Sequence, residues 1–122
     1  MKLLLDTHIL VWSLMDDPRL KGRYRRALEG AEEIHVSAVS IWEIGIKQAL
    51  GKLQIDGDIM TMIRRTNCLP LVVTWDHGSA AGLLPRHHDD PFDRLLIAQA
   101  RCEGLTLVSA DRMVRRYDVP LI

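Results

Sequence analysis

Short apolar runs alternate with longer helix-like stretches along this chain, and that alternation limits its fold more than any other feature. The apolar runs predict buried strands, while the stretches between them space their apolar residues like helices and often end at glycine, as at Gly30, Gly51 and Gly104. Strands separated by helices pair in parallel through right-handed crossovers, with helices on both faces of the sheet. The sequence therefore predicts a three-layer α/β/α domain. The predicted strands are 3–5, 34–37, 71–73, 105–109 and 119–121, and the predicted helices are 7–15, 19–29, 40–50, 59–65, 76–83, 91–103 and 112–116.

Length and charge narrow the classes of protein to which the chain can belong. Its 122 residues suit one domain, residues 1–122, and 16 Lys and Arg balance 16 Asp and Glu, so any contact with a polyanion must be local. Cys68 and Cys102 form no metal-binding or disulfide-rich pattern, which favours a reducing cytoplasm. The chain has neither a signal-peptide pattern nor an apolar run long enough to span a membrane, so we expect no membrane partner.

Acidic side chains follow the ends of several predicted strands. In open α/β sheets, ligands bind beyond the carboxyl ends of the strands, at the point where the strand order reverses. We expect four acids to lie along that edge, each near the start of a helix. They are Asp6, Glu43, Asp93 and Asp111.

Helix capping offers a simpler explanation for each acid taken singly. Ser40 and Glu43 have the spacing of a capping box, and Asp90, Pro91 and Asp93 have the usual chemistry of a helix start. Capping places acids at helix starts anywhere on a protein, however, whereas these four are expected at one edge of the sheet. Neighbouring carboxylates remain ionised together only when a cation compensates them, and all-oxygen donors favour Mg²⁺ or Mn²⁺. The pattern therefore predicts a divalent-metal site for phosphate chemistry.

Four segments, in this order and spacing, carry a resemblance to a known family. They are residues 4–8 (LLDTH), 37–44 (SAVSIWEI), 90–98 (DPFDRLLIA) and 107–111 (LVSAD). Together they resemble the PIN domains, and within that family the VapC-like toxin ribonucleases of type II toxin–antitoxin pairs. The resemblance covers residues 3–121 and implies a five-stranded parallel sheet in the order 3-2-1-4-5. It also implies a metal-dependent endoribonuclease that leaves 5′-phosphate and 3′-hydroxyl ends.

The resemblance assigns roles to the acids by position. It implies that Asp6, Asp93 and Asp111 bind Mg²⁺ or Mn²⁺ and that Glu43 holds or polarises a metal-bound water. All four are expected to be catalytic, with the hydroxyls of Thr7 and Ser109 in support. Many relatives carry a further acid where this chain has Met113, which leaves the number of metal ions open. The implied partners are an RNA substrate, a cognate antitoxin and a second copy of the chain.

Two other classes of protein are disfavoured because residues that they require are absent. A receiver domain or a haloacid-dehalogenase-type phosphatase needs a further acid just after Asp6, where Thr7 and His8 stand. The alternative that remains open is a catalytically silent PIN-like module that binds RNA or protein. Basic side chains that could contact RNA are equally compatible with solvated helix faces. They are Lys21, Arg23, Arg25, Arg26, Lys47, Lys52, Arg64, Arg65, Arg112, Arg115 and Arg116.

Histidine and tryptophan residues also have two interpretations. His87 and His88 could bind a transition metal, but their polar surroundings favour a solvated loop. Trp12, Trp42 and Trp75 are predicted to anchor packing rather than to stack on bases. None of these five residues is placed in the predicted site.

Overall fold

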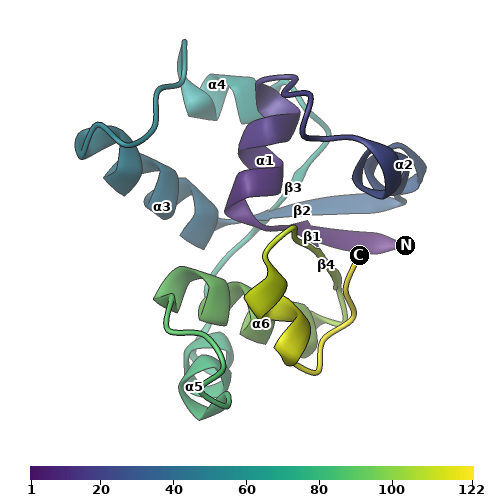
Figure 1. Cartoon of the computed structure of the whole chain (residues 1–122), viewed down its shortest axis with the longest axis vertical. Coiled ribbons are helices and arrows are strands. Elements are labelled where there is room, and N and C mark those ends of the chain that lie inside the picture. The colour runs from purple at the N-terminus through teal and green to yellow at the C-terminus, as the bar shows by residue number, and fades with distance from the viewer.

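A central parallel sheet separates two layers of helices (Figure 1). The computed structural model describes residues 1–122. All strand pairs are parallel, and the order is β3-β2-β1-β4, so the strand order reverses between β1 and β4. The strands are β1 (Lys2–Leu5), β2 (Glu33–Ser37), β3 (Leu69–Leu71) and β4 (Thr106–Val108).

The predicted fifth strand is reduced to a single bridge. Leu121 pairs in parallel with Leu107 on the free side of β4, and the Ile122 amide donates to the Leu107 carbonyl at 3.0 Å. The chain at 119–121 therefore occupies the fifth position of the predicted order 3-2-1-4-5. Pro120 has no amide hydrogen to donate to a ladder, which is consistent with pairing this short.

The helices cover both faces of the sheet. α1 to α4 lie on one face, and α5 and α6 on the other (Figure 1). None of these helices combines the length and the apolar character that crossing a membrane requires. The helices are α1 (Thr7–Leu14), α2 (Gly22–Gly30), α3 (Ala38–Ala49), α4 (Ile59–Arg64), α5 (Trp75–Leu83) and α6 (Pro91–Glu103), followed by a 3₁₀-helix, η1 (Arg112–Arg116).

Strand β1 divides the core in two because successive side chains point to opposite faces. Leu3 and Leu5 pack on the face of α1 to α4, together with Ile9 and Ile44, whereas Leu4 packs against α6 on the other face. Each of these leucines is almost fully buried, and burying one contributes about 1.5–3 kcal/mol. The middle strand is thereby fixed between the two layers, which places the residue that follows it at a defined point of the sheet edge.

Helix α3 begins earlier than the sequence predicted. The prediction began the helix at Ser40, with Ser40 and Glu43 as a capping box, and this was wrong. Ser37 is the N-cap: its Oγ accepts a hydrogen bond from the Val39 amide at 3.1 Å and donates to Oε1 of Gln99 at 2.6 Å. Strand β2 therefore runs directly into α3, and Glu43 is available for contacts outside its own helix.

Strand β3 also lies two residues earlier than predicted. It pairs Leu69 and Leu71 with β2, and Pro70 is tolerated because β3 is an edge strand. Val72 and Val73, which were predicted to be strand residues, are exposed instead. The apolar run 71–73 indicated a strand correctly but did not define its register.

The prediction that all three tryptophans anchor packing was wrong for two of them. The side chain of Trp75 is 96% exposed, and that of Trp42 is 65% exposed with one edge-on contact to Phe92 at 5.3 Å between ring centroids. Trp12 is partly buried and packs against the core. Trp42 lies within α3, and Trp75 is the first residue of α5.

Candidate functional site

The four predicted acids lie just after strands or within the first two turns of helices. Asp6 directly follows β1 and caps α1, and Asp111 follows β4 and caps η1. Asp93 is the third residue of α6, and Glu43 lies in the second turn of α3. Since β1 and β4 are adjacent parallel strands, their carboxyl ends open onto the same edge of the sheet.

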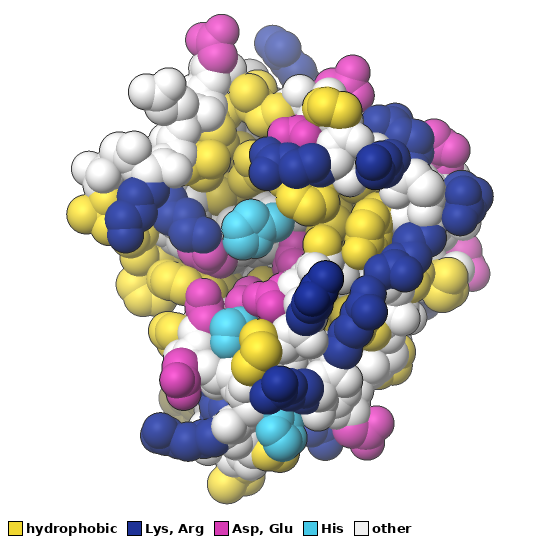
Figure 2. Space-filling model, in the orientation of Figure 1, with side chains coloured by type: hydrophobic (Ala, Val, Ile, Leu, Met, Phe, Trp, Pro, Cys, Tyr) yellow, Lys and Arg dark blue, Asp and Glu magenta, His cyan; other side chains and the backbone are white.

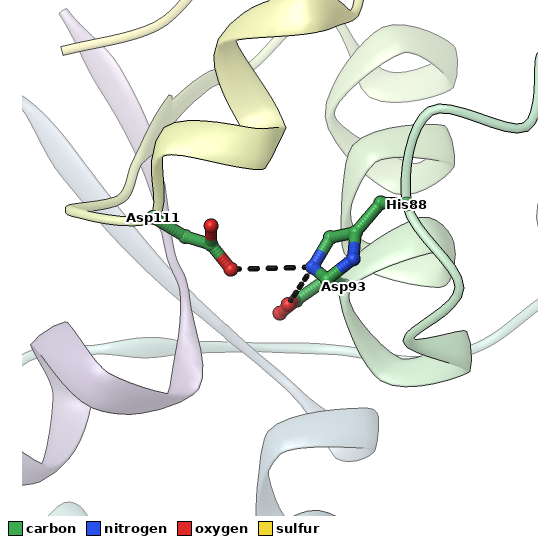
Figure 3. Close-up of side chains that lie close together, drawn as sticks. All are labelled: His88, Asp93 and Asp111. Atoms are coloured by element: carbon green, nitrogen blue, oxygen red, sulfur yellow. Dashed lines mark hydrogen bonds and ion pairs between the residues drawn. The ribbon is translucent and has the colours of Figure 1, made fainter.

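Two of the acids meet at a histidine. Nε2 of His88 lies 2.8 Å from Oδ2 of Asp93 and 3.2 Å from Oδ2 of Asp111 (Figure 3). One donor atom from each of these residues falls within 4.8 Å of the others, which is close enough for all three to bind one ion. The side chain of His88 is only 16% exposed, so the prediction of a solvated loop was wrong for this residue.

The loop that carries His88 is fixed by Tyr117 and Arg94. The Tyr117 hydroxyl accepts hydrogen bonds from the His88 amide at 2.9 Å and from the His87 amide at 3.2 Å. Arg94 donates to the carbonyls of Leu84 at 3.0 Å and Pro85 at 2.9 Å, at the other end of the same segment. These contacts hold residues 84–88 against α6 and aim the imidazole at the two carboxylates.

Asp6 lies deeper than the other two aspartates. It is 3% exposed, and its Oδ1 accepts a hydrogen bond from the Ile9 amide at 2.8 Å. Burial raises the pKa of Asp6, and hydrogen bonds with Ser109 and the Ile9 amide oppose that rise. The Ser109 Oγ also accepts from the Asp111 amide at 3.1 Å. Ser109 therefore lies between Asp6 and Asp111 and contacts both.

Glu43 has partners for both carboxylate oxygens. Its Oε1 accepts a 2.6 Å hydrogen bond from the Thr7 hydroxyl, and its Oε2 forms a 2.7 Å ion pair with Lys47 one turn later. Thr7 Oγ1 also lies 3.1 Å from Oγ of Ser40. Glu43 is 2% exposed and near enough to Asp6 for its charge to raise the pKa of Asp6. It lies beside the cluster of His88, Asp93 and Asp111 and is not part of it.

Crowding of carboxylates shifts the ionisation of the site. Burial, followed by the charges of Asp90 and Asp6, raises the pKa of Asp93 to about 7. Burial lowers the pKa of His88, but the hydrogen bond and charge of Asp93, together with Asp111, outweigh that effect and raise it. Asp90 itself caps α6, accepting hydrogen bonds from the Phe92 and Asp93 amides, as predicted. The arrangement concentrates negative charge that only a proton or a cation can compensate.

The donor atoms fit a divalent cation. Carboxylate oxygens from Asp93, Asp111 and the neighbouring Asp6 are hard ligands, and burial is the main cause that raises the pKa values of Asp6 and Asp93. The sequence analysis considered His88 as a metal ligand but favoured a solvated loop, because the path of this loop depends on Tyr117, which lies far along the chain. The signal in the sequence was the position of the two histidines just before an acidic helix start.

Two adjoining hollows open beside the acids. A hollow of about 260 Å³ is lined by Asp6, His8, Trp12, Ala110 and Asp111. The other, of about 410 Å³, shares His8 and Trp12 and continues to Arg19, Lys47 and Lys52. Figure 2 shows a hollowed face with acidic side chains at its floor, histidines beside them and Lys and Arg side chains around them. A polyanion could therefore approach the acids along basic walls.

Comparisons with known proteins found a matching family and similar folds. The sequence profile of the PIN domain matches residues 3–120. Ribonuclease VapC22 of Mycobacterium tuberculosis is 28% identical over 120 residues, covering 96% of this chain and 92% of that protein.

Two solved structures share the fold. The first is of VapBC2 from Rickettsia felis bound to a promoter DNA fragment, with a TM-score of 0.75, 18% identity and coverage of 100% of this chain and 98% of that one. The second is of DNA-bound VapBC from Salmonella typhimurium, with a TM-score of 0.73, 15% identity and coverage of 100% and 97%. Because the two proteins are only 18% and 15% identical to this chain, the likeness establishes the fold alone.

Proposed function

Because this chain belongs to the PIN domain family, we propose that it is a metal-dependent endoribonuclease and the toxin of a VapBC-type toxin–antitoxin pair. The observation that carries the proposal is the meeting of Asp93 and Asp111 at the sheet edge beside buried Asp6. The likeness to a curated VapC ribonuclease along almost the whole chain supports the choice of RNA as substrate. We further propose that residues 1–122 form one PIN-like domain that works in the cytoplasm.

The resident cation in this proposal is Mg²⁺ or Mn²⁺, held by Asp6, Asp93 and Asp111. A divalent cation in such a site lowers the pKa of water and neutralises charge on phosphate oxygens. The protein keeps the three carboxylates close together and largely out of bulk solvent, so that they are ready to bind. Ser109 orients Asp6 through its hydroxyl and Asp111 through the backbone.

Glu43 acts in this proposal on the attacking water rather than on the cation. Thr7 and Lys47 contact both of its oxygens, which holds the carboxylate in one orientation beside Asp6. A carboxylate held in this way can accept a hydrogen bond from a water molecule and direct its lone pair toward phosphorus. Lys47 also lines the basic hollow, where an RNA phosphate next to the scissile one could lie.

The partners follow the same proposal. We expect a cognate antitoxin to hold the toxin inactive, because the similar structures of the fold are toxin–antitoxin complexes. We also expect a homodimer. The exposed apolar side chains Trp42, Val72 and Trp75 offer surface that either partner could cover.

Incubating the purified protein with total RNA tests the function. We expect cleavage in Mg²⁺ or Mn²⁺ that EDTA abolishes and that Asp6→Asn and Asp93→Asn each reduce about a hundredfold or more. Asp56→Asn is the matched control, because Asp56 is exposed and lies outside the cluster. Cleavage that persists in EDTA and in both site variants would reject the proposal. Intact RNA in every condition, with folded protein, would favour the silent binding module.

A further inference from the structure

The side chain of His88 contacts two of the acids that we propose to bind the divalent cation. Its Nε2 is 2.8 Å from an oxygen of Asp93 and 3.2 Å from an oxygen of Asp111, so one nitrogen faces both carboxylates at once (Figure 3). A histidine that formed a single ion pair would face one carboxylate, whereas this ring faces two. The side chain is also mostly shielded from solvent.

The two distances from His88 Nε2 to the carboxylates match the spacing of neighbouring ligands around an octahedral ion. Donors about 2.1 Å from an ion in octahedral geometry lie about 3.0 Å from each adjacent donor. The two distances from His88 Nε2 fall on either side of that value. A cation could therefore bind Nε2 and one oxygen each from Asp93 and Asp111 with little movement of the imidazole.

The backbone that carries the imidazole is held in place by the fold. The His88 amide donates to the Tyr117 hydroxyl, which also contacts Arg94, and Arg94 ties the preceding residues to α6. His87 differs from His88 in this respect, because its ring packs edge-on against Tyr117 and does not reach the acids. A fixed backbone at this position limits the directions in which the ring can point and keeps it near the two acids.

We propose that His88 is a nitrogen ligand of the divalent cation held by Asp93 and Asp111, and that it makes the site select Mn²⁺ or another first-row transition metal over Mg²⁺. This inference rests on the proposed metal-dependent function and adds a ligand and a selectivity to it. Imidazole binds transition-metal ions well, whereas Mg²⁺ prefers oxygen ligands and retains its waters. A site of carboxylates alone would not discriminate in this way.

Pulsed electron paramagnetic resonance on the Mn²⁺-loaded protein tests the inference directly. At about pH 8, where an ordinary imidazole is neutral, we expect modulation from a directly bound nitrogen in the wild-type spectrum. The same signal should remain in His87→Gln and His8→Gln and disappear in His88→Gln. His8→Gln is included because His8 lines the neighbouring hollow. The wild-type spectrum gives an answer even if a variant fails to fold.

Metal affinities give a second readout. We expect His88→Gln to weaken Mn²⁺ binding about tenfold or more and Mg²⁺ binding much less, measured by titration with each ion alone. The opposite result, equal or tighter Mn²⁺ binding in His88→Gln, would mean that the imidazole blocks the acids, and it would overturn the proposal. A wild-type spectrum without bound nitrogen would overturn it too.

Parallel RNA cleavage assays separate this inference from the proposed function. EDTA-sensitive cleavage with no nitrogen signal would leave the ribonuclease standing and reject His88 as a ligand. A nitrogen signal without cleavage would support the ligand and reject the ribonuclease.

Discussion

The hydroxyl of Thr7 donates a 2.6 Å hydrogen bond to Oε1 of Glu43, which joins the first turn of α1 to the second turn of α3. Both side chains are almost completely buried. A buried carboxylate is tolerated only when its oxygens have partners, and Glu43 finds its partners in Thr7 and Lys47. This contact fixes the orientation of an acid that we propose to act on water.

Thr7→Val should therefore destabilise the protein more than its small change of shape suggests. Valine has nearly the same volume but leaves Oε1 of Glu43 without its donor, so the free energy of unfolding should fall by about 1–3 kcal/mol. Thr7→Ser keeps the hydroxyl and should cost less than about 1 kcal/mol. Urea unfolding of both variants measures the difference. Equal losses for valine and serine would show that the hydrogen bond contributes nothing to stability.

Much of the site could be predicted from sequence because topology alone brings its parts together. Strands β1 and β4 are parallel neighbours, so Asp6 and Asp111, which follow them, must lie at one edge. Asp93 joins them because it begins the helix that leads into β4. These positions depend on the order of strands and helices along the chain. That order is indicated by the spacing of apolar residues and by the glycines that end helices.

The remainder depends on contacts between distant segments, which a local pattern does not contain. Ser37 and Ser40 both precede helical sequence, and the hydrogen bond from Ser37 to Gln99 fixes Ser37 at the point where strand becomes helix. His88 enters the site because Tyr117, in the last turns of the chain, holds its amide. The roles of Asp6, Glu43, Asp93, Asp111, Thr7 and Ser109 remain predictions, and Asp6→Asn and Asp93→Asn test two of them.

The ionisation of Asp93 predicts how metal-free protein responds to pH. Its pKa is about 7 in the folded state against an ordinary 3.8, so between these values the folded state holds a proton that the unfolded state has released. Stability must then fall as pH rises from about 4 to 7, on the order of 2 kcal/mol after allowing for coupling to His88. The raised pKa of His88 acts in the same direction, because its stabilising proton is lost as pH rises through the folded value.

Thermal unfolding in EDTA at about pH 5 and pH 7.5 measures this dependence. Asp93→Asn removes the titrating group and should flatten the decline, whereas the exposed control Asp56→Asn should keep the wild-type slope. Added Mg²⁺ or Mn²⁺ should stabilise the wild type more at the higher pH, where the carboxylates are ionised. An Asp93→Asn protein with an unchanged slope would show that another group carries the effect.

Tyr117→Phe tests whether the loop at 84–88 must be held for the site to work. The variant removes the hydroxyl that accepts hydrogen bonds from the His87 and His88 amides but keeps the aromatic ring. We expect a loss of about 1 kcal/mol in unfolding free energy, faster hydrogen exchange at those two amides and a several-fold fall in kcat with little change in KM. Tyr24→Phe is the matched control, since the Tyr24 hydroxyl accepts only from exposed Arg23. An unchanged kcat with faster exchange would show that loop order is dispensable for turnover.

The hollow that contains Lys52 is the expected path of RNA toward the acids. It adjoins the acidic hollow through His8 and Trp12, and Lys52 is exposed at its wall. In the inactive Asp93→Asn background, Lys52→Ala should weaken binding to single-stranded RNA several-fold at low salt. It should also reduce the slope of log K against log salt by about 0.7, the amount for one phosphate contact on a single strand. Arg101→Ala is the matched control, because Arg101 lies in the last turn of α6 and lines a different hollow. Equal slopes for both variants would place the RNA elsewhere on the surface and leave the acids to be reached from another side.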